Sequence, residues 1–326
     1  MDDVLNILRA AADPTRLRIL CLLESGELSV SELVAILGQS QPRVSRHLKV
    51  LVDAGLLARL REGSWVFHRI QPSARARAAA LTGMVPPDDP VRVLDHARLG
   101  EIERQRADEA EAYFARFAGE WDRLRQLDVD EEAIAAQIRV MLPLTHEQRL
   151  LDLGTGTGRM LQVLGPDAGE AVGVDASHDM LTVARANLKR WGLANCRVRQ
   201  GDILALPGAQ ESFDAVVMHQ VLHFLDRPWA AIAEAARTLR PGGQMLVVDL
   251  APHGVEELRE RHAHRRLGFA DDEVGGWLED QGLTVRAVHH MPGALGVTIW
   301  LARRLGGQPA ARSTTTFEGL QQGAPA

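Results

Sequence analysis

The sequence predicts an α/β protein with two domains: a small helix-turn-helix domain that carries a β-hairpin, then a larger parallel sheet with helices on both faces. A chain of 326 residues is long enough for two domains. The first 70 residues carry short helical patterns and end in a hairpin pattern. From Leu150 onward strand and helix patterns alternate, which indicates a parallel sheet.

Composition and cysteine usage favour a cytoplasmic protein. Hydrophobic residues make up 46% of the chain and charged residues 25%, which is ordinary for soluble globular proteins. No apolar run reaches about 18 residues, so no membrane span is expected. The acidic start Met1-Asp2-Asp3 lacks the layout of a secretory signal. With only Cys21 and Cys196, a disulfide framework is not expected either.

Charge is distributed unevenly between the two ends of the chain. Residues 1–85 hold 11 Lys+Arg and 8 Asp+Glu, a net charge of +3. The remaining residues hold 26 and 35, a net charge of −9. This asymmetry favours an anionic partner for the first domain and a small-molecule role for the second.

The first domain begins with two short helices and a capping signal. An apolar stripe from Val4 to Ala12 predicts one helix, and Pro14 opens another that ends before Gly26. The stretch Ser29-Val30-Ser31-Glu32 has the form of a capping box, in which Ser29 and Glu32 satisfy backbone N–H groups at a helix start.

Two further helices form the predicted helix-turn-helix. The first covers 30–37 and stops at Gly38, and Ser40 caps the second, which covers 41–54 and has Pro42 in its first turn. Apolar residues of the second helix face the core: Val44, Leu48 and Leu51. Its opposite side is polar and basic: Gln41, Arg43, Arg46, His47 and Lys49.

Residues 56–70 predict a β-hairpin around a Glu-Gly turn, with Arg59, Arg61 and Arg69 on it. A hairpin placed after a helix-turn-helix is called a wing. Basic residues on such a wing suit contacts with a phosphate backbone, which makes affinity fall steeply with salt.

Three segments resemble ArsR/SmtB-type winged helix-turn-helix transcriptional repressors: "ADPTRLRIL" (12–20), "SQPRVSRHLKVL" (40–51) and "REGSWVFHRI" (61–70). The resemblance covers about the first 75 residues. It implies a homodimer that reads pseudo-palindromic, double-stranded operator DNA, with the helix at 41–51 in the major groove. The implied DNA-binding residues are Gln41, Arg43, Ser45, Arg46, His47, Arg59 and Arg61. Arg and Gln side chains suit bidentate bonds to base edges.

An alternative stays open for this domain. Winged-helix domains also serve only as dimerisation modules in some small-molecule O-methyltransferases. The polar, basic face of 41–49 favours DNA binding, because the centre of a protein interface is depleted in charge.

The resemblance also indicates what this chain does not sense. Many relatives bind metal through a cysteine pair in a Glu-Leu-Cys-Val-Cys motif, and the matching positions here are Ser29 and Ser31. A hydroxyl is a poor ligand for soft metals, which need thiolate. We therefore expect no metal site, and an effector that binds elsewhere.

The chain between the two domains is expected to be a linker with a long charged helix over about 91–127. Its Gly/Pro/Ser/Thr/Gln-rich end is expected to be disordered. The predicted organisation is a winged helix-turn-helix domain at 1–85, the linker at 86–127, a ligand-binding domain at 128–305 and a tail at 306–326.

In the second domain, seven strands are expected at 149–153, 171–175, 196–199, 214–219, 244–250, 284–289 and 296–302. The segment "LLDLGTGTGR" (150–159) reads as strand, Gly-rich turn and helix start. A nicotinamide-dinucleotide fingerprint would need glycine at 159, where this chain has Arg159.

The segment instead resembles motif I of the Rossmann-like class I S-adenosylmethionine-dependent methyltransferases, through Asp152, Gly154, Gly156 and Gly158. The resemblance extends to "VGVDAS", "FDAVVMHQVLHFL" (213–225) and "LRPGG" (239–243) and covers roughly 110–304. It implies S-adenosylmethionine or S-adenosylhomocysteine as ligand, with Asp175 on the ribose hydroxyls and Asp202 near the adenine amino group. His219 is included among the ligand-binding residues.

Whether the domain transfers a methyl group is open at this point, with a lean toward a methyltransferase. A base is needed only if the acceptor is protonated. His219 and His223 are candidate bases because they follow the fourth strand, at the edge where acceptors lie in open α/β sheets. Further histidines could line an acceptor pocket: His262, His264, His289 and His290. Arsenic methylation is rejected, since it needs several cysteines and this domain has only Cys196.

The prediction is therefore an ArsR-type regulator that responds to S-adenosylmethionine, S-adenosylhomocysteine or a methyl acceptor. The alternative is a small-molecule methyltransferase that uses its winged helix only to dimerise. The operator, the acceptor, turnover and the sign of regulation are not readable from the sequence.

Overall fold

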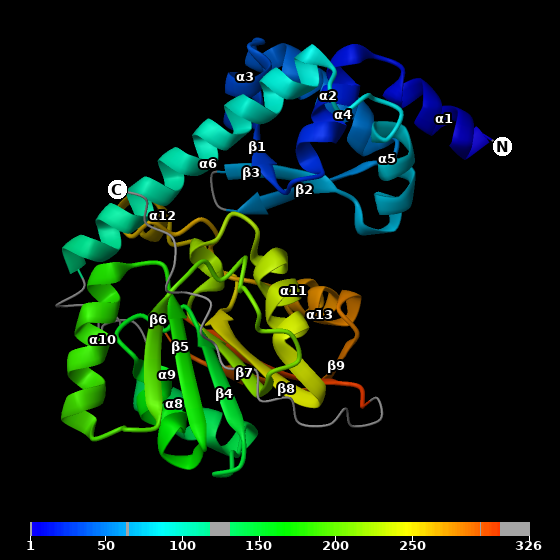
Figure 1. Ribbon diagram of the computed structural model, residues 1–326. Coiled ribbons are helices and arrows are strands. Elements are labelled where there is room, and N and C mark those ends of the chain that lie inside the picture. Colours follow the sequence, from blue (N-terminus) through cyan, green and yellow to red (C-terminus); the bar gives the residue numbers. More distant parts are fainter. Residues whose placement is uncertain (1, 63–64, 118–130, 294, 307–326) are drawn as a thin grey trace. The chain divides into compact units, whose positions relative to one another are not determined.

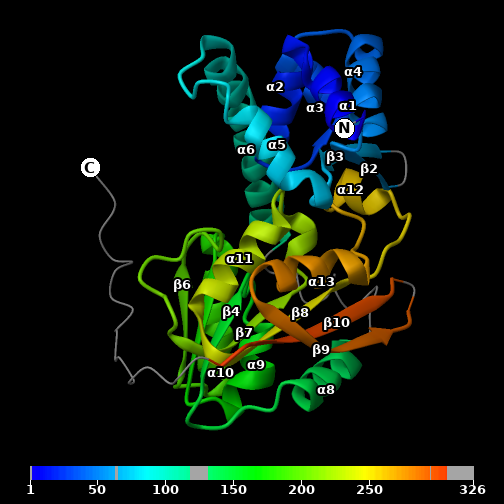
Figure 2. The same ribbon diagram turned by 90° about the vertical axis from the view of Figure 1, so that its right-hand side faces the viewer.

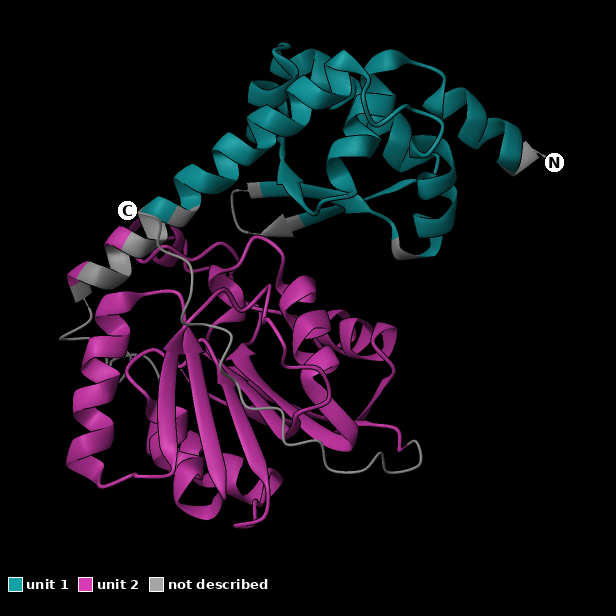
Figure 3. Cartoon of the chain, in the orientation of Figure 1, with its two compact units in different colours: residues 1–109 teal, residues 110–326 magenta. Residues whose placement is uncertain are grey.

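The computed structural model describes residues 2–62, 65–117, 131–293 and 295–306. The chain divides into two compact units, Met1–Glu109 and Ala110–Ala326 (Figures 1 and 3). The predicted tail and the end of the predicted linker helix lie almost entirely outside the described residues. None of the described helices combines the length and the apolar character needed to cross a bilayer.

Unit 1 is a winged helix-turn-helix, as predicted. Its elements are α1 (Asp2–Ala11), α2 (Pro14–Leu23), β1 (Leu28–Ser29), α3 (Val30–Leu37), α4 (Gln41–Asp53), β2 (Leu57–Glu62), β3 (Trp65–Ile70), a short 3-10 turn (Pro72–Ala74), α5 (Arg75–Thr82) and most of α6 (Pro90–Phe117). The sheet has the antiparallel order β1-β3-β2. Strand β1 was not expected. It forms because Leu28 pairs with His68 and Ser29 with Phe67, a contact that no local pattern indicates.

Capping side chains set the starts of the helices in unit 1. Asp13 Oδ1 accepts a hydrogen bond from the Arg16 N–H at 3.1 Å, at the start of α2. The predicted capping box of α3 is present. Ser29 Oγ accepts from the Glu32 N–H at 3.3 Å, and Glu32 Oε2 accepts from the Ser29 N–H at 2.8 Å. Ser40 occupies the N-cap position of α4, but its side chain makes no capping hydrogen bond.

Ion pairs hold the first part of α6 against the rest of unit 1. The Arg18 guanidinium makes a bidentate pair with Asp95, at 2.6 and 2.7 Å, and the Asp95 side chain is buried. Arg98 Nη1 donates to the Ile36 carbonyl at 2.8 Å, and Arg106 pairs with Glu32. The helix is therefore part of the folded first unit along much of its length.

Unit 2 is a Rossmann-like α/β fold (Figure 2). Its strands are β4 (Arg149–Leu153), β5 (Glu170–Asp175), β6 (Cys196–Gln200), β7 (Phe213–His219), β8 (Leu239–Leu250), β9 (Leu283–Met291) and β10 (Val297–Arg304). Its helices are α8 (Glu131–Met141), α9 (Arg159–Leu164), α10 (His178–Trp191), α11 (Pro228–Thr238), α12 (Glu257–Arg261) and α13 (Asp271–Asp280), with 3-10 turns at Gly165–Asp167 and Leu222–Phe224. The strand order is β6-β5-β4-β7-β8-β10-β9, and β10 runs antiparallel to both of its neighbours.

Helices cover both faces of this sheet, and alternate residues of each strand face opposite cores (Figure 2). Leu150 packs with α8, α9 and α10, whereas Leu151 packs with α11 and α13. The same alternation separates Val217 from Val216 on β7. Burial on both faces explains why the strands read as continuous apolar runs.

Strand β8 differs from the expectation at its start. Residues 239–243, expected as a loop before the strand, belong to β8, because Leu239 pairs with Phe213 and Gln244 with Ala215. The register shifts between Phe213 and Ala215 of β7. The extra residues lie in β8, between Leu239 and Gln244, and form a bulge.

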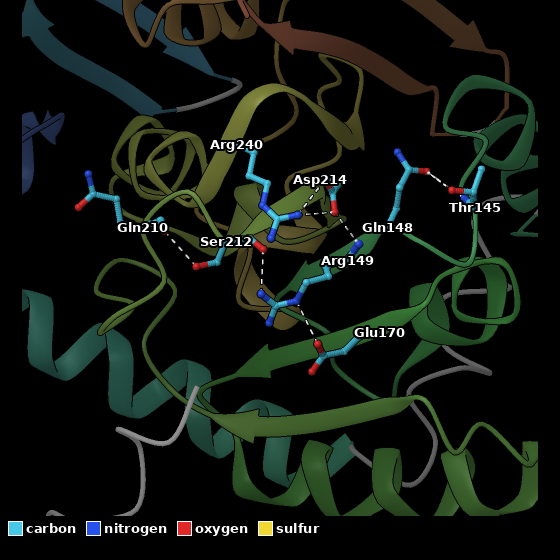
Figure 4. A network of polar contacts seen from close by, with 8 residues as sticks. All are labelled: Thr145, Gln148, Arg149, Glu170, Gln210, Ser212, Asp214 and Arg240. Atoms are coloured by element: carbon cyan, nitrogen blue, oxygen red, sulfur yellow. Dashed lines mark hydrogen bonds and ion pairs between the residues drawn. The ribbon is translucent and has the colours of Figure 1, made fainter. Parts of the chain in front are cut away.

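A polar network ties the amino ends of four strands together (Figure 4). Asp214 accepts from the Arg149 backbone N–H at 2.8 Å and from the Arg240 guanidinium at 3.1 Å. The Arg149 side chain donates to Glu170 and to the Ser212 carbonyl, each at 3.0 Å. These contacts join β4, β5, β7 and β8 at the edge opposite to the one where ligands bind in such sheets.

Replacing Asp214 by Ala should destabilise unit 2. The change leaves a half-buried backbone N–H and a guanidinium without their acceptor, which costs about 1–3 kcal/mol. The control is Glu257→Ala, which removes an exposed i,i+4 pair with Arg261 and should change the free energy of unfolding by less than about 0.5 kcal/mol. Urea unfolding followed by circular dichroism measures both. Equal effects for the two variants would contradict the role given to Asp214.

Candidate functional site

The exposed side of α4 carries the residues expected at DNA. Gln41, Arg43, Ser45 and Arg46 are exposed, while the apolar stripe of the helix is buried in the core of unit 1. His47 is in a different position. Its Nδ1 lies 3.5 Å from Oδ1 of Asp13, and the ring is half-buried. The structure thus joins His47 to the carboxylate that caps α2.

The wing residues fall into different surroundings. Arg59 is exposed on β2, directly opposite His68 of β3. Burial, and then the Arg59 charge, lower the pKa of His68 to about 4, so Arg59 places an exposed cation opposite a neutral imidazole. Arg61 lies in β2 opposite Val66, and its side chain lies outside the described residues. Arg69 makes an ion pair with Glu27 at 3.1 Å.

The two serines at the thiol positions of the resembled repressors are engaged with each other. Ser29 is buried, and its Oγ lies 2.9 Å from Oγ of Ser31. Burial raises the pKa of the Cys21 thiol, which keeps it protonated. Within the described ranges, no group of three or more His, Cys, Asp or Glu side chains could hold a metal ion.

The glycine loop of unit 2 lies at the point where the chain leaves the sheet in opposite directions. Strand β4 pairs with β5 on one side and with β7 on the other, and all three run parallel. Gly154, Gly156 and Gly158 have φ angles of 71°, 53° and 90°, a region that favours glycine. A Cβ on Gly154 would lie 2.3 Å from Val221 Cγ2, so the loop packs directly against the segment after β7.

Two carboxylates hold this loop. Asp152 is buried and accepts from the Thr155 hydroxyl at 2.6 Å. Asp175, at the end of β5, accepts from the Gly156 N–H at 2.8 Å and from the Ser177 N–H at 2.9 Å. Burial raises the pKa of Asp175, against the lowering effect of these N–H groups.

The geometry of Asp175 fits the ribose of S-adenosylmethionine. Each carboxylate oxygen accepts one backbone N–H and keeps capacity for a ribose hydroxyl. Asp202 follows β6, is exposed, and accepts from the Leu204 N–H at 2.8 Å. It is therefore held in a turn at the same edge of the sheet, next to the strand that ends in Asp175.

The candidate bases follow β7. His219 is the last residue of the strand and is buried, and His223 lies in the short turn that follows. His223 Nδ1 lies 2.7 Å from Oδ1 of Asp249, whose side chain is fully buried in β8. Sequence reasoning missed Asp249. Its signal is a carboxylate inside the apolar run "MLVVDL" of a strand buried on both faces.

A second histidine packs on this pair. The His264 ring stacks on His223, with centroids 4.1 Å apart and an interplanar angle of 27°. Burial strongly lowers the pKa of His264, and the neighbouring histidines His223 and His253 lower it further. Burial also lowers the pKa of His253. By contrast, His290 pairs with Asp271 at 3.2 Å, on the edge strand β9.

Replacing Gly154 by Ala should weaken S-adenosylmethionine binding by more than about 10-fold, since the added Cβ meets Val221 and the backbone strain costs about 1–2 kcal/mol. Gly192→Ala is the matched control. Gly192 has the same φ of +71°, but a Cβ there meets nothing within 4 Å. Titration calorimetry gives the affinity, and thermal unfolding the stability. Loss of binding in both variants would show that strain alone, and not the loop's shape, is responsible.

Comparison with known proteins supports the assignment of unit 2. Residues 151–247 match the model "Methyltransferase domain". The chain is 31% identical over 168 residues to an arsenite methyltransferase of Aquipseudomonas alcaligenes, covering 42% of this chain and 47% of that protein. It spans less than half the length of this and other methyltransferases that it matches. The cofactor of this domain is S-adenosylmethionine, which supplies a methyl group on a sulfonium sulfur.

The first unit has equally specific relatives. Residues 13–59 match the model "Bacterial regulatory protein, arsR family". The arsenical resistance operon repressor of Escherichia coli is 45% identical over 78 residues, which are 24% of this chain and 67% of that protein. The arsenic resistance transcriptional regulator ArsR1 of Pseudomonas putida is 39% identical over 98 residues, 29% of this chain and 77% of that protein. The chain belongs to the arsR family of bacterial regulatory proteins, with a methyltransferase domain fused behind its DNA-binding domain.

Proposed function

We propose that this chain is a homodimeric transcriptional regulator whose affinity for a pseudo-palindromic operator changes when S-adenosylmethionine, S-adenosylhomocysteine or a methyl acceptor binds unit 2. The observation that carries the proposal is that serines occupy the thiol positions of unit 1 while unit 2 has a candidate site for a different ligand. Ser29 and Ser31 stand where many members of the resembled repressors carry a thiol pair, and Ser29 instead caps α3 while Ser31 contacts it. In unit 2, the glycine loop and Asp175 are the proposed ligand site.

The exposed residues of α4 give the proposed interface with DNA. Arg43 and Arg46 present guanidinium groups that suit guanine edges or phosphates, and Gln41 suits an adenine edge. Arg59 on the wing would contact the phosphate backbone. His47 would orient the helix through Asp13, and would reach DNA only by leaving that carboxylate.

Arsenicals fit this chain poorly as effector or substrate, although all three relatives named above carry arsenic in their names. Soft metalloids need thiolates. Cys21 stands in unit 1, and burial raises its pKa. Cys196 stands in unit 2, where burial and the charge of Asp152 raise its pKa to about 11, so the thiol stays protonated at neutral pH. Neither buried thiol has a second cysteine beside it to complete a soft-metal site.

Ligand control of DNA binding requires a difference in ligand affinity between two states of the protein. The ligand must bind the DNA-competent and DNA-incompetent forms unequally, and DNA then changes ligand affinity by the same factor. S-adenosylmethionine carries a sulfonium charge that S-adenosylhomocysteine lacks. The two cofactor forms therefore differ in charge, through which their affinities for the two states of the protein can differ.

A second candidate is a methyltransferase that uses the winged helix only to dimerise. The buried pair of His223 and Asp249 favours it, because such a pair is suited to proton transfer. The two candidates differ in whether the parent protein binds DNA at all.

Replacing Arg43 or Arg46 by Ala should weaken operator binding by about 10- to 100-fold, equivalent to about 1–3 kcal/mol for a base contact. An arginine in contact with phosphate would instead weaken binding to all sequences and lower the salt dependence by about one ion. Fluorescence anisotropy with DNA from upstream of the gene measures both. The control is Arg77→Ala, an exposed arginine on α5. If the parent protein binds no DNA, the dimerisation candidate stands.

Saturating S-adenosylmethionine or S-adenosylhomocysteine should change operator affinity by about 5- to 150-fold, the usual range of allosteric coupling. Asp175→Asn should weaken ligand binding by about 10-fold or more and abolish this response, while ligand-free DNA binding is retained. Asp179→Asn removes the same charge from an exposed position on α10 and serves as the control. Unchanged operator affinity at saturation with both cofactor forms and with added acceptor would refute cofactor sensing.

A further inference from the structure

The pair of Asp249 and His223 has the geometry of an oriented base. Asp249 lies near the carboxyl end of β8, and its side chain is fully buried. Its Oδ1 lies 2.7 Å from His223 Nδ1 and also accepts from the Leu250 N–H at 2.8 Å, while Oδ2 accepts from the Leu222 N–H at 3.0 Å. The carboxylate is therefore held in place by backbone donors and does not depend on the imidazole for its position.

Sheet topology places this pair beside the cofactor loop. Strands β4 and β7 are neighbours, and Gly154 follows one strand as His223 follows the other. Val221, which Gly154 contacts, lies two residues before His223. In open α/β sheets the reacting groups gather at such a point, where neighbouring strands lead the chain in opposite directions.

The hydrogen bond to Asp249 selects one tautomer of His223. In a neutral imidazole whose Nδ1–H donates to a carboxylate, Nε2 carries the lone pair. Across the described part of the chain, Asp249 is the one hydrogen-bond partner of the His223 ring, so Nε2 remains available to accept a proton. Asp249 also stabilises the imidazolium that would result.

Aromatic groups line the pair. His264 stacks on His223, and the Phe224 ring lies 4.1 Å from His223 and 5.1 Å from His264, between centroids. Because its pKa is strongly lowered, His264 is a neutral ring at physiological pH. Such rings pack favourably against another aromatic ring, in an offset-stacked or edge-to-face arrangement.

We propose that unit 2 methylates the hydroxyl group of a phenolic compound, with His223 as the catalytic base and Asp249 as its positioning residue. The inference rests on the binding of S-adenosylmethionine at the adjoining loop. The hydroxyl proton passes to Nε2 of His223 while the oxygen forms its bond to the methyl carbon. The sulfur–methyl bond breaks and its electron pair returns to sulfur, so the positive charge moves from the sulfonium to the imidazolium beside Asp249.

A hydroxyl acceptor explains why a base is present. Thiolates, and amines with a free lone pair, attack a sulfonium methyl without losing a proton first. A phenol, with a pKa of about 10 like that of Tyr, is almost fully protonated at neutral pH and needs a base. Bases of this kind contribute about 10²- to 10⁴-fold in rate.

The experiment measures transfer of labelled methyl from S-adenosylmethionine by the full chain to a set of phenols. The set contains 4-methylphenol, which is protonated at neutral pH, and 4-nitrophenol, which is substantially ionised there, with benzenethiol and aniline as non-hydroxyl probes. Methyl transfer to the phenols is expected. His223→Ala should lower kcat for 4-methylphenol by about 10²- to 10⁴-fold and for 4-nitrophenol by much less. Added imidazole should restore activity with 4-methylphenol.

Two further variants test the positioning role and the specificity of the effect. Asp249→Asn should lower kcat about 10-fold or more at unchanged KM, without rescue by imidazole, because His223 is still present but misoriented. His146→Ala, at an exposed histidine in the loop before β4, should leave the rates unchanged.

The outcomes separate this inference from the proposed function. If His223→Ala reduces transfer to both phenols equally and imidazole restores nothing, the histidine has a structural role and the inference is overturned. If S-adenosylmethionine binds and changes operator affinity but no hydroxyl probe is methylated, the inference is overturned while the proposed regulator stands. If S-adenosylmethionine does not bind, the inference is overturned, and the proposed regulator fails as well if neither S-adenosylhomocysteine nor an acceptor changes operator affinity.

Discussion

The parallel pairing of β4 with β7 is the constraint on which the ligand-binding half depends. The two strands are neighbours, yet the chain continues from β4 toward β5 on one side and from β7 toward β8 on the other. The segments after them therefore meet, and Gly154 has no room for a Cβ because Val221 lies against it. The network around Asp214 and Arg149 fixes the opposite ends of the same strands, so the register that creates this meeting point is held at the edge away from the ligand.

In the DNA-binding half, single carboxylates contact two elements at once. Asp13 caps α2 and also lies within ion-pair distance of His47 on α4, so one carboxylate contacts both a helix start and the proposed recognition helix. Glu32 closes the capping box of α3 and also pairs with Arg106 of α6. Serine at 29 and 31 suits this arrangement, because a hydroxyl caps a helix well and binds soft metals poorly.

Serines replace the thiol pair in unit 1, and the candidate reactive groups of unit 2 are carboxylates and imidazoles. Burial lowers the pKa values of His253 and His264, which keeps both rings neutral near the pair of His223 and Asp249. A neutral, polar, aromatic lining is compatible with both binding of the cofactor and acceptance of a proton.

Local patterns were enough to predict most of the elements. The 3.6- and 2-residue periods, the Ser29–Glu32 cap and the glycine loop are written within windows of a few residues, and the strand that ends in Asp175 follows from the same patterns. For that reason both domains and the parallel sheet could be predicted.

Local sequence patterns thus account for most of the elements, for the exposed polar side of α4 and for the glycine loop after β4. Tertiary structure alone decided the strand β1, the extension of β8 through 239–243, the position of His47 against Asp13 and the partnership of His223 with Asp249 and His264. The physical reason is separation along the chain. His223 and Asp249 are 26 residues apart and meet only because β7 and β8 pair in one register, which no local window contains.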